Sequence, residues 1–173
     1  MKKQFRLPLL FPFLLGALLT SCAISEPLKV FVRGDGSNMY FVKPQRFNGK
    51  TGCRYVTVDW TIHTKHDSVE RVVMNYSVYA DRPMRRVDSL RFQSPTLNGA
   101  WIAGGKCFFI EPSGRGFQSR WSADFPIGDL QKLFSSPNVR IELQGGVHIV
   151  NEGGGATKKT FKALRTELLP LLQ

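Results

Sequence analysis

The chain has 173 residues, of which 42% are apolar, and this content is typical of a folded globular protein rather than a disordered one. Its 24 Lys and Arg residues outnumber 13 Asp and Glu residues, so the formal net charge is +11. A charge of this size favours anionic neighbours such as phospholipid headgroups, lipopolysaccharide or acidic glycans. Solubility alone is the other explanation of the same charge.

The first 22 residues have the pattern of a secretory signal. Three basic residues within the first six precede the uncharged stretch Leu7–Leu19. This stretch has about 13 residues, whereas a helix needs about 20 to cross a bilayer. Pro8 and Pro12 also disfavour a permanent membrane-spanning helix, which is the alternative interpretation. We therefore expect an exported protein.

The end of this segment, Leu19-Thr20-Ser21-Cys22, resembles the lipobox of bacterial lipoproteins. The resemblance implies that Cys22 becomes the mature N-terminus and carries acyl chains on its thioether and its amine. Two or more chains hold a protein firmly on a membrane, whereas one binds only marginally. Ordinary signal cleavage after Ala23 is the alternative, because Ser21 and Ala23 also satisfy the rule for small residues at a cleavage site.

The predicted organisation is a signal peptide over residues 1–21, a lipid-anchored tether over 22–27 and a single domain over 28–173. Removing the signal leaves 21 basic and 13 acidic residues, so the mature chain has a charge of +8. The residues after Cys22 lack an aspartate that would retain a lipoprotein in the inner membrane. This favours the bacterial cell envelope, at the outer membrane facing the periplasm, where nucleic acid is not an expected partner.

Cys53 and Cys107 remain when Cys22 is assigned to the anchor. Outside the cytoplasm a pair of thiols tends to oxidise, so we expect a Cys53–Cys107 disulfide. The strand pattern around residue 107 places Phe108 and Ile110 inward and Cys107 outward, consistent with a cross-strand bridge. Two unpaired packing residues are the alternative.

Alternating apolar residues predict a series of antiparallel strands. Leu28–Arg33 and Met39–Lys43 form a first hairpin, and Pro44–Gly52 is a polar loop. Arg54–Thr64 and Val69–Ala80 form a long hairpin at the centre of the domain. Shorter strands follow at Val87–Gln93, Lys106–Glu111, Phe117–Phe125, Val139–Leu143 and Val147–Val150.

Two helices complete the prediction. A short one occupies Gly128–Ser135, and an amphipathic one begins at Thr157 as its N-cap and ends near Leu169, before Pro170. The C-terminal helix covers a sheet face or, alternatively, binds a membrane surface. The expected fold is mainly β, an antiparallel sandwich or curled sheet with this helix packed on it.

Arg82, Arg85, Arg86 and Arg91 lie within ten residues and are candidates for binding phosphate or carboxylate groups. A solvated edge, whose charges discourage pairing between molecules, is an equally physical explanation. Trp101 lies in a glycine-rich loop, where it either caps the core, which we favour, or stacks on a sugar ring.

The sequence predicts no catalytic, metal or cofactor site. His63 and His66 would not share a face on a strand and turn, and no nucleophile motif is present. The first functional hypothesis is a non-enzymatic envelope module that binds a protein or an anionic lipid or glycan, and an assembly role is its close variant. The alternative is an envelope hydrolase acting on glycan, lipid or peptidoglycan.

Overall fold

The computed structural model describes residues 26–66 and 68–172. The predicted signal, Cys22 and the first part of the tether lie outside the described residues. No helix within the described residues is long and apolar enough to span a bilayer.

The described chain forms one curled, open sheet of eleven antiparallel strands. Along the sheet the order is β6-β5-β10-β11-β2-β3-β4-β9-β8, with β1 paired to β2 and β7 paired to β5. The strands are β1 (Leu28–Val32), β2 (Ser37–Thr51), β3 (Tyr55–Lys65), β4 (Ser68–Ala80), β5 (Val87–Ser94), β6 (Leu97–Asn98), β7 (Ile102–Ala103), β8 (Lys106–Ser113), β9 (Gly116–Asp124), β10 (Arg140–Gly145) and β11 (Ile149–Gly153). The predicted mainly β fold with a curled antiparallel sheet and a C-terminal helix is confirmed.

Strands β3 and β4 form the central hairpin that the sequence predicts, with Trp60 opposite Met74. Every second residue of β3 faces the concave side and is fully buried there: Val56, Val58, Trp60 and Ile62. The period of two therefore specifies one apolar and one polar face, because successive side chains of a strand point to opposite sides.

Strand β2 is longer than its sequence suggests, since the predicted loop Pro44–Gly52 is mostly strand. The pairing of β2 with β3 shifts register just before Gln45. A bulge at this point accommodates a proline, which has no N–H to donate to the ladder. The side chain of Gln45 also donates a hydrogen bond to the Lys43 carbonyl at 2.9 Å.

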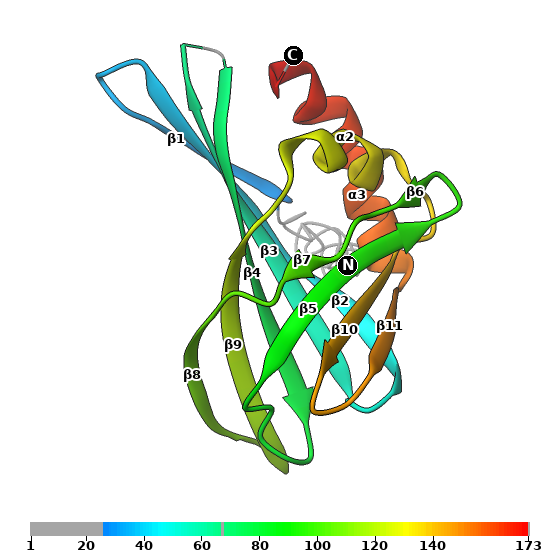
Figure 1. Cartoon of the computed structure of the whole chain (residues 1–173). Helices are drawn as coiled ribbons and strands as arrows, with labels where there is room; N and C mark the ends of the chain where they lie inside the picture. The colour runs from blue at the N-terminus through cyan, green and yellow to red at the C-terminus, as the bar shows by residue number, and fades with distance from the viewer. Residues whose placement is uncertain (1–25, 67, 173) are drawn as a thin grey trace, which may run out of the picture.

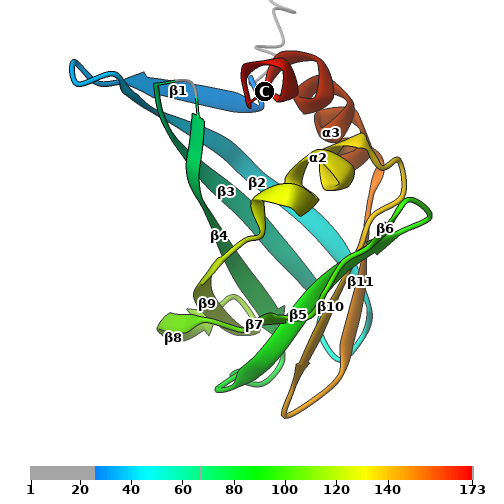
Figure 2. The same ribbon diagram turned by 45° about the horizontal axis from the view of Figure 1, so that its top comes forward.

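Two helices, α2 (Ile127–Ser135) and α3 (Gly155–Glu167), cover one end of the concave face, and the short 3-10 helix η1 (Leu169–Leu172) follows. Figures 1 and 2 show α2 and α3 side by side, with the β4–β5 and β10–β11 turns at the opposite end. The packing of α3 on the sheet confirms the first of its two predicted roles.

An aromatic cluster seals this helix-covered end. Trp60 of β3 lies 5.5 Å from Phe134 of α2 and 5.9 Å from Phe161 of α3, measured between ring centroids. Phe47 and Phe92 extend the cluster to β2 and β5. The rings meet at tilted or edge-to-face angles, which are the favourable arrangements for aromatic pairs.

The predicted N-cap of α3 is wrong. Helix α3 begins after Gly154, and Thr157 lies inside its first turn. The buried Thr157 hydroxyl donates instead to the Arg46 carbonyl at 2.7 Å. Strands β1 and β11 pair with opposite halves of the same edge of β2. Arg46 lies between these two halves, so the hydrogen bond from Thr157 attaches α3 to the part of β2 that neither strand pairs with.

The segment between β7 and β8 draws the two walls of the sheet together. The backbone N–H of Gly104 donates to the Asp88 carbonyl at 2.9 Å, and the buried Tyr76 hydroxyl donates to the Gly104 carbonyl. Gly105 has φ +82°, and a Cβ there would lie 1.9 Å from the Ser122 carbonyl oxygen. Glycine is therefore required at this crossing.

The expected Cys53–Cys107 disulfide does not form, and both thiols are free. Cys53 precedes β3, whereas Cys107 lies on β8, three strands away across β4 and β9. Three strand spacings correspond to about 14 Å, which is too far for a disulfide. Cys107 also pairs with Trp121 on the concave side, so its predicted outward orientation is wrong.

Candidate functional site

A pocket of about 730 Å³ opens at the end of the sheet opposite the helices. Three turns surround it: 52–54 between β2 and β3, 81–86 between β4 and β5, and 146–147 between β10 and β11. The turns meet here because β2, β4 and β10 run in the same direction in this antiparallel sheet, so the turns that follow them lie at the same end.

The floor of the pocket is apolar. Ala80, Met84 and Ile149 are buried beneath it. The backbone N–H of Met84 donates to the Ser119 hydroxyl at 3.1 Å, which holds the β4–β5 turn inside the curl of the sheet. The interior is therefore closed by a loop at this end, whereas two helices close the other end.

Four exposed arginines surround the opening: Arg54, Arg82, Arg85 and Arg86. Arg54 lies 3.4 Å from Asp81, and Arg86 pairs with Asp88. Arg82 and Arg85 form no ion pair with any other described residue. With Asp81 as its single acidic member, the pocket lining carries a formal charge of +3.

Three of the four predicted anion-binding residues thus lie together, and the fourth does not. Arg91 lies on β5, where its guanidinium contacts the Glu142 carboxylate at 2.9 and 3.0 Å. The same guanidinium stacks 4.4 Å above the Trp101 ring, which is exposed and does not cap the core as expected. Arg54 was missed because nothing in the sequence connects it to a loop about 30 residues away.

Cys53 contributes a thiol to the pocket wall. The buried amide of Asn151 contacts its sulfur, with a distance of 3.4 Å from the amide nitrogen. Burial raises the pKa of the Cys53 thiol, and the Asn151 hydrogen bond opposes this only in part. The thiol is therefore neutral at physiological pH, and a neutral thiol is a poor nucleophile.

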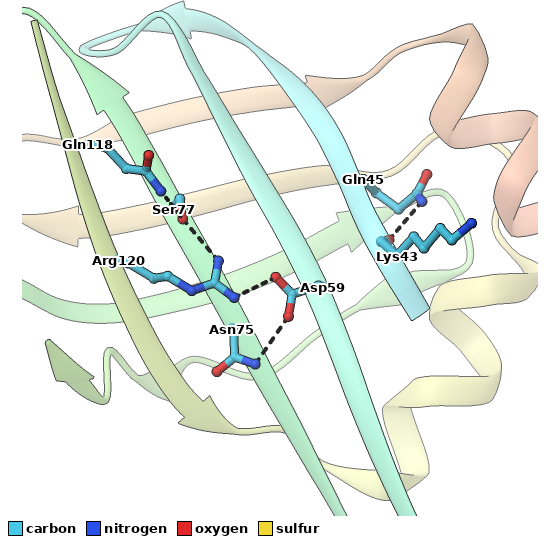
Figure 3. A network of polar contacts seen from close by, with 7 residues as sticks. All are labelled: Lys43, Gln45, Asp59, Asn75, Ser77, Gln118 and Arg120. Atoms are coloured by element: carbon cyan, nitrogen blue, oxygen red, sulfur yellow. Dashed lines mark hydrogen bonds and ion pairs between the residues drawn. The ribbon is translucent and has the colours of Figure 1, made fainter. Parts of the chain in front are cut away.

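A second polar cluster crosses the convex face of the sheet (Figure 3). Asp59 of β3 is only 1% exposed, and its carboxylate contacts the Arg120 guanidinium of β9 at 2.9 Å. Asn75 donates to the other carboxylate oxygen at 3.1 Å, and Arg120 also donates to the Ser77 hydroxyl. The carboxylate already has partners on both of its oxygens, so the cluster ties β3, β4 and β9 together.

Two of the three histidines lie near the same end of β3, and the third lies in another turn. His63 lies on β3, His66 follows that strand, and His148 lies between β10 and β11, 3.9 Å from the Glu142 carboxylate. Among the described residues, no group of three or more His, Cys, Asp or Glu side chains is placed to hold a metal ion.

The chain matches no protein-family model, and no curated protein or solved structure is significantly similar to it. Of the two polar clusters, the pocket rim presents arginines to solvent, whereas the convex cluster is satisfied internally. The pocket is the candidate site.

Proposed function

We propose that this chain is a lipid-anchored envelope lipoprotein whose domain binds an anionic ligand in the arginine-rimmed pocket. The anionic group lies against Arg82 and Arg85, and an attached apolar group rests over Met84 and Ile149. Binding or assembly, rather than turnover, is the proposed role.

The observation that carries this proposal is the pairing of an apolar floor with a cationic rim that acidic residues neutralise only in part, at Arg54 and Arg86. Arg82 and Arg85 lack acidic partners within the described chain, and both lie in one short loop held by a buried methionine. Guanidinium groups bind carboxylate and phosphate oxygens through short, charge-assisted hydrogen bonds. Apolar floors with a few polar groups are typical of small-molecule sites.

The composition of the pocket lining supports binding over hydrolysis. A hydrolase of glycan, lipid or peptidoglycan uses a nucleophile with a base, or two facing carboxylates. The lining offers Cys53, a thiol that burial keeps protonated, and the single carboxylate of Asp81, which contacts Arg54.

The ligand proposal is tested by calorimetric titration with dodecyl phosphate below its micellar concentration. Inorganic phosphate and octyl glucoside supply the anionic head and the apolar chain separately. We expect dodecyl phosphate to bind more tightly than either. The double variant Arg82→Ala/Arg85→Ala removes the charge-assisted hydrogen bonds to the phosphate. We expect it to weaken binding at least about 10-fold.

Arg115→Ala is the matched control, because Arg115 is an exposed arginine in the turn between β8 and β9, outside the pocket. The Arg115→Ala variant is expected to bind dodecyl phosphate as tightly as the unaltered protein does. Weakening by Arg115→Ala equal to that by Arg82→Ala alone, which removes the same single charge, would show that net charge, rather than the pocket, governs binding. Unchanged affinity in the double variant would overturn the proposed site.

The anchor is tested separately, by growing cells with radiolabelled palmitate. We expect label on the mature chain and none on a Cys22→Ser variant. An unlabelled mature chain that begins at Ile24 would contradict lipidation and would leave the pocket proposal intact.

A further inference from the structure

The two ends of the main strand path are protected to different degrees, and β1 lies off this path, paired to β2. The edge formed by β5 is covered by β6 and β7 of the same chain. Strand β8, at the other edge, pairs with β9 alone among the described strands. An open strand edge presents unpaired N–H and C=O groups that favour pairing with another strand.

Strand β8 also exposes three consecutive apolar side chains. Phe108 is 55% exposed, and Phe109 and Ile110 are each 37% exposed. An exposed apolar run on an open edge strand is typical of an interaction site.

A bulge arranges the remaining side chains of β8. The register with β9 shifts between Cys107 and Phe109, so Lys106 and Glu111 face the convex side together. Without the bulge, two residues five positions apart would lie on opposite faces. Cys107 and Ile110 correspondingly face the concave side, opposite Trp121 and Ser119.

We propose that β8 pairs antiparallel with β8 of a second copy of this chain, about a two-fold axis between Phe108 and Phe109. In this register Lys106 lies opposite Glu111 of the second copy, on the convex side. Cys107 lies opposite Ile110 of the second copy, on the concave side. The pairing joins two eleven-stranded sheets into one and covers the exposed phenylalanines.

Charge complementarity selects a second copy as the occupant. Neither Lys106 nor Glu111 forms an ion pair with another described residue. Antiparallel self-pairing places Lys106 of each copy opposite Glu111 of the other, so two ion pairs form across the interface. Pro112, which cannot donate to a ladder, limits the paired run to Lys106–Glu111. Six residues form a small interface, so we expect weak, reversible association in solution.

The proposal is tested by disulfide trapping with the native Cys107. In a Cys53→Ser background, Ile110→Cys places a thiol opposite Cys107 of the second copy. Directly opposed residues have Cα atoms about 4.5–5.5 Å apart, within disulfide range, whereas residues 107 and 110 of one strand are about 10 Å apart. Mild oxidation of the mature chain is expected to produce a dimer whose 107–110 link is identified by peptide mapping.

Val147→Cys in the same background is the control, because Val147 is even more exposed than Ile110, at 50% against 37%, but lies at the pocket end. We expect at least ten times less dimer from it. Equal yields, the absence of a dimer, or mapped links other than 107–110 would overturn the proposal.

A charge exchange tests the register. Lys106→Glu is expected to reduce the trapped dimer several-fold by opposing two carboxylates, and the double variant Lys106→Glu/Glu111→Lys is expected to restore it. Failure of the exchange to restore the dimer would contradict the register even if trapping occurred. Thermal unfolding of each variant checks that the monomer remains folded.

Discussion

The two ends of the curled sheet enclose the same apolar interior and close it in different ways. At one end, α2 and α3 insert Phe134 and Phe161 against Trp60, and an aromatic cluster fills the space. At the other end, a single loop inserts Met84, and a pocket of about 730 Å³ remains above it, surrounded by arginines. Figure 2 shows the helices at one end and the β4–β5 and β10–β11 turns at the other.

This difference between the ends predicts that one end mainly stabilises the fold and the other mainly binds ligand. A helix can bury a whole apolar face, so the covered end is expected to supply much of the folding free energy. A short polar loop buries little, and the exposed guanidinium groups at its rim add net charge without internal ion pairs for Arg82 and Arg85. We therefore expect substitutions at the covered end to affect unfolding and those at the open end to affect ligand binding.

The largest expected effect is at the covered end. Phe161→Ala removes a fully buried ring from the contact of α3 with Trp60 and Phe134, and we expect a loss of about 3–5 kcal/mol in the free energy of unfolding. Denaturant unfolding measures it. Leu171→Ala, at a side chain that is 49% exposed, is the control and should cost less than about 0.5 kcal/mol. Comparable losses for the two variants would show that the buried aromatic cluster does not supply the stability of the covered end.

The second prediction concerns β3, β4 and β9, which the Asp59–Arg120 cluster joins. Arg120→Met leaves the buried Asp59 carboxylate without its cationic partner. Removing one partner of a fully buried pair costs about 3–5 kcal/mol, and because Arg120 is partly exposed we expect about 2–3 kcal/mol in denaturant unfolding. Adding Asp59→Asn to Arg120→Met removes the unpaired charge and should recover part of the loss. If the double variant is no more stable than Arg120→Met, the ion pair is not what stabilises these strands.

The open end should tolerate the loss of its charges. The Arg82→Ala/Arg85→Ala variant removes two exposed side chains that pair with no described acidic residue, so we expect its free energy of unfolding to change by less than about 0.5 kcal/mol. Any change is expected to be a gain, because like charges around the pocket repel one another. A loss above about 2 kcal/mol would show that the rim stabilises the fold, and the pocket would then lose its separate role.

The smallest effect concerns the pH dependence of Cys53. Because burial raises its pKa above that of an ordinary thiol, its alkylation rate should keep rising at pH values where an unfolded control has levelled off. Mass spectrometry of the iodoacetamide adduct measures this in a Cys107→Ser background. The raised pKa also stabilises the fold below the ordinary thiol pKa, and this contribution is lost as pH rises through the folded-state pKa. Identical rate profiles for folded and unfolded chains would contradict burial of the thiol.

The strands that the sequence predicts well are those with one fully buried face. The alternation in β3, with Trp60 at its centre, leaves one register in which every apolar residue is buried, and the structure adopts it. In β8 and β2 the alternation is interrupted by bulges, so Cys107 was assigned to the wrong face and the second half of β2 was taken for a loop. A bulge depends on the partner strand, and single-strand periodicity does not contain it.

The candidate site was predicted only in part for a related reason. Arg82, Arg85 and Arg86 are adjacent in the chain, so one loop carries them wherever it lies. Arg54 joins them because β3 and β4 are neighbours, and Arg91 leaves them because its strand turns it toward Glu142. The Trp101 ring stacks on the Arg91 guanidinium and does not pack into the core.

By itself, the sequence determines what local order and composition can specify: alternating strands, an amphipathic C-terminal helix and an excess of basic residues. The resemblance of its first 22 residues to a lipoprotein signal stays a prediction. Tertiary structure alone decided which strand ends meet, so that three turns form one pocket and two cysteines lie three strands apart. The physical reason is that periodicity reports which face of an element is buried, whereas proximity between distant residues depends on strand order and register across the whole sheet.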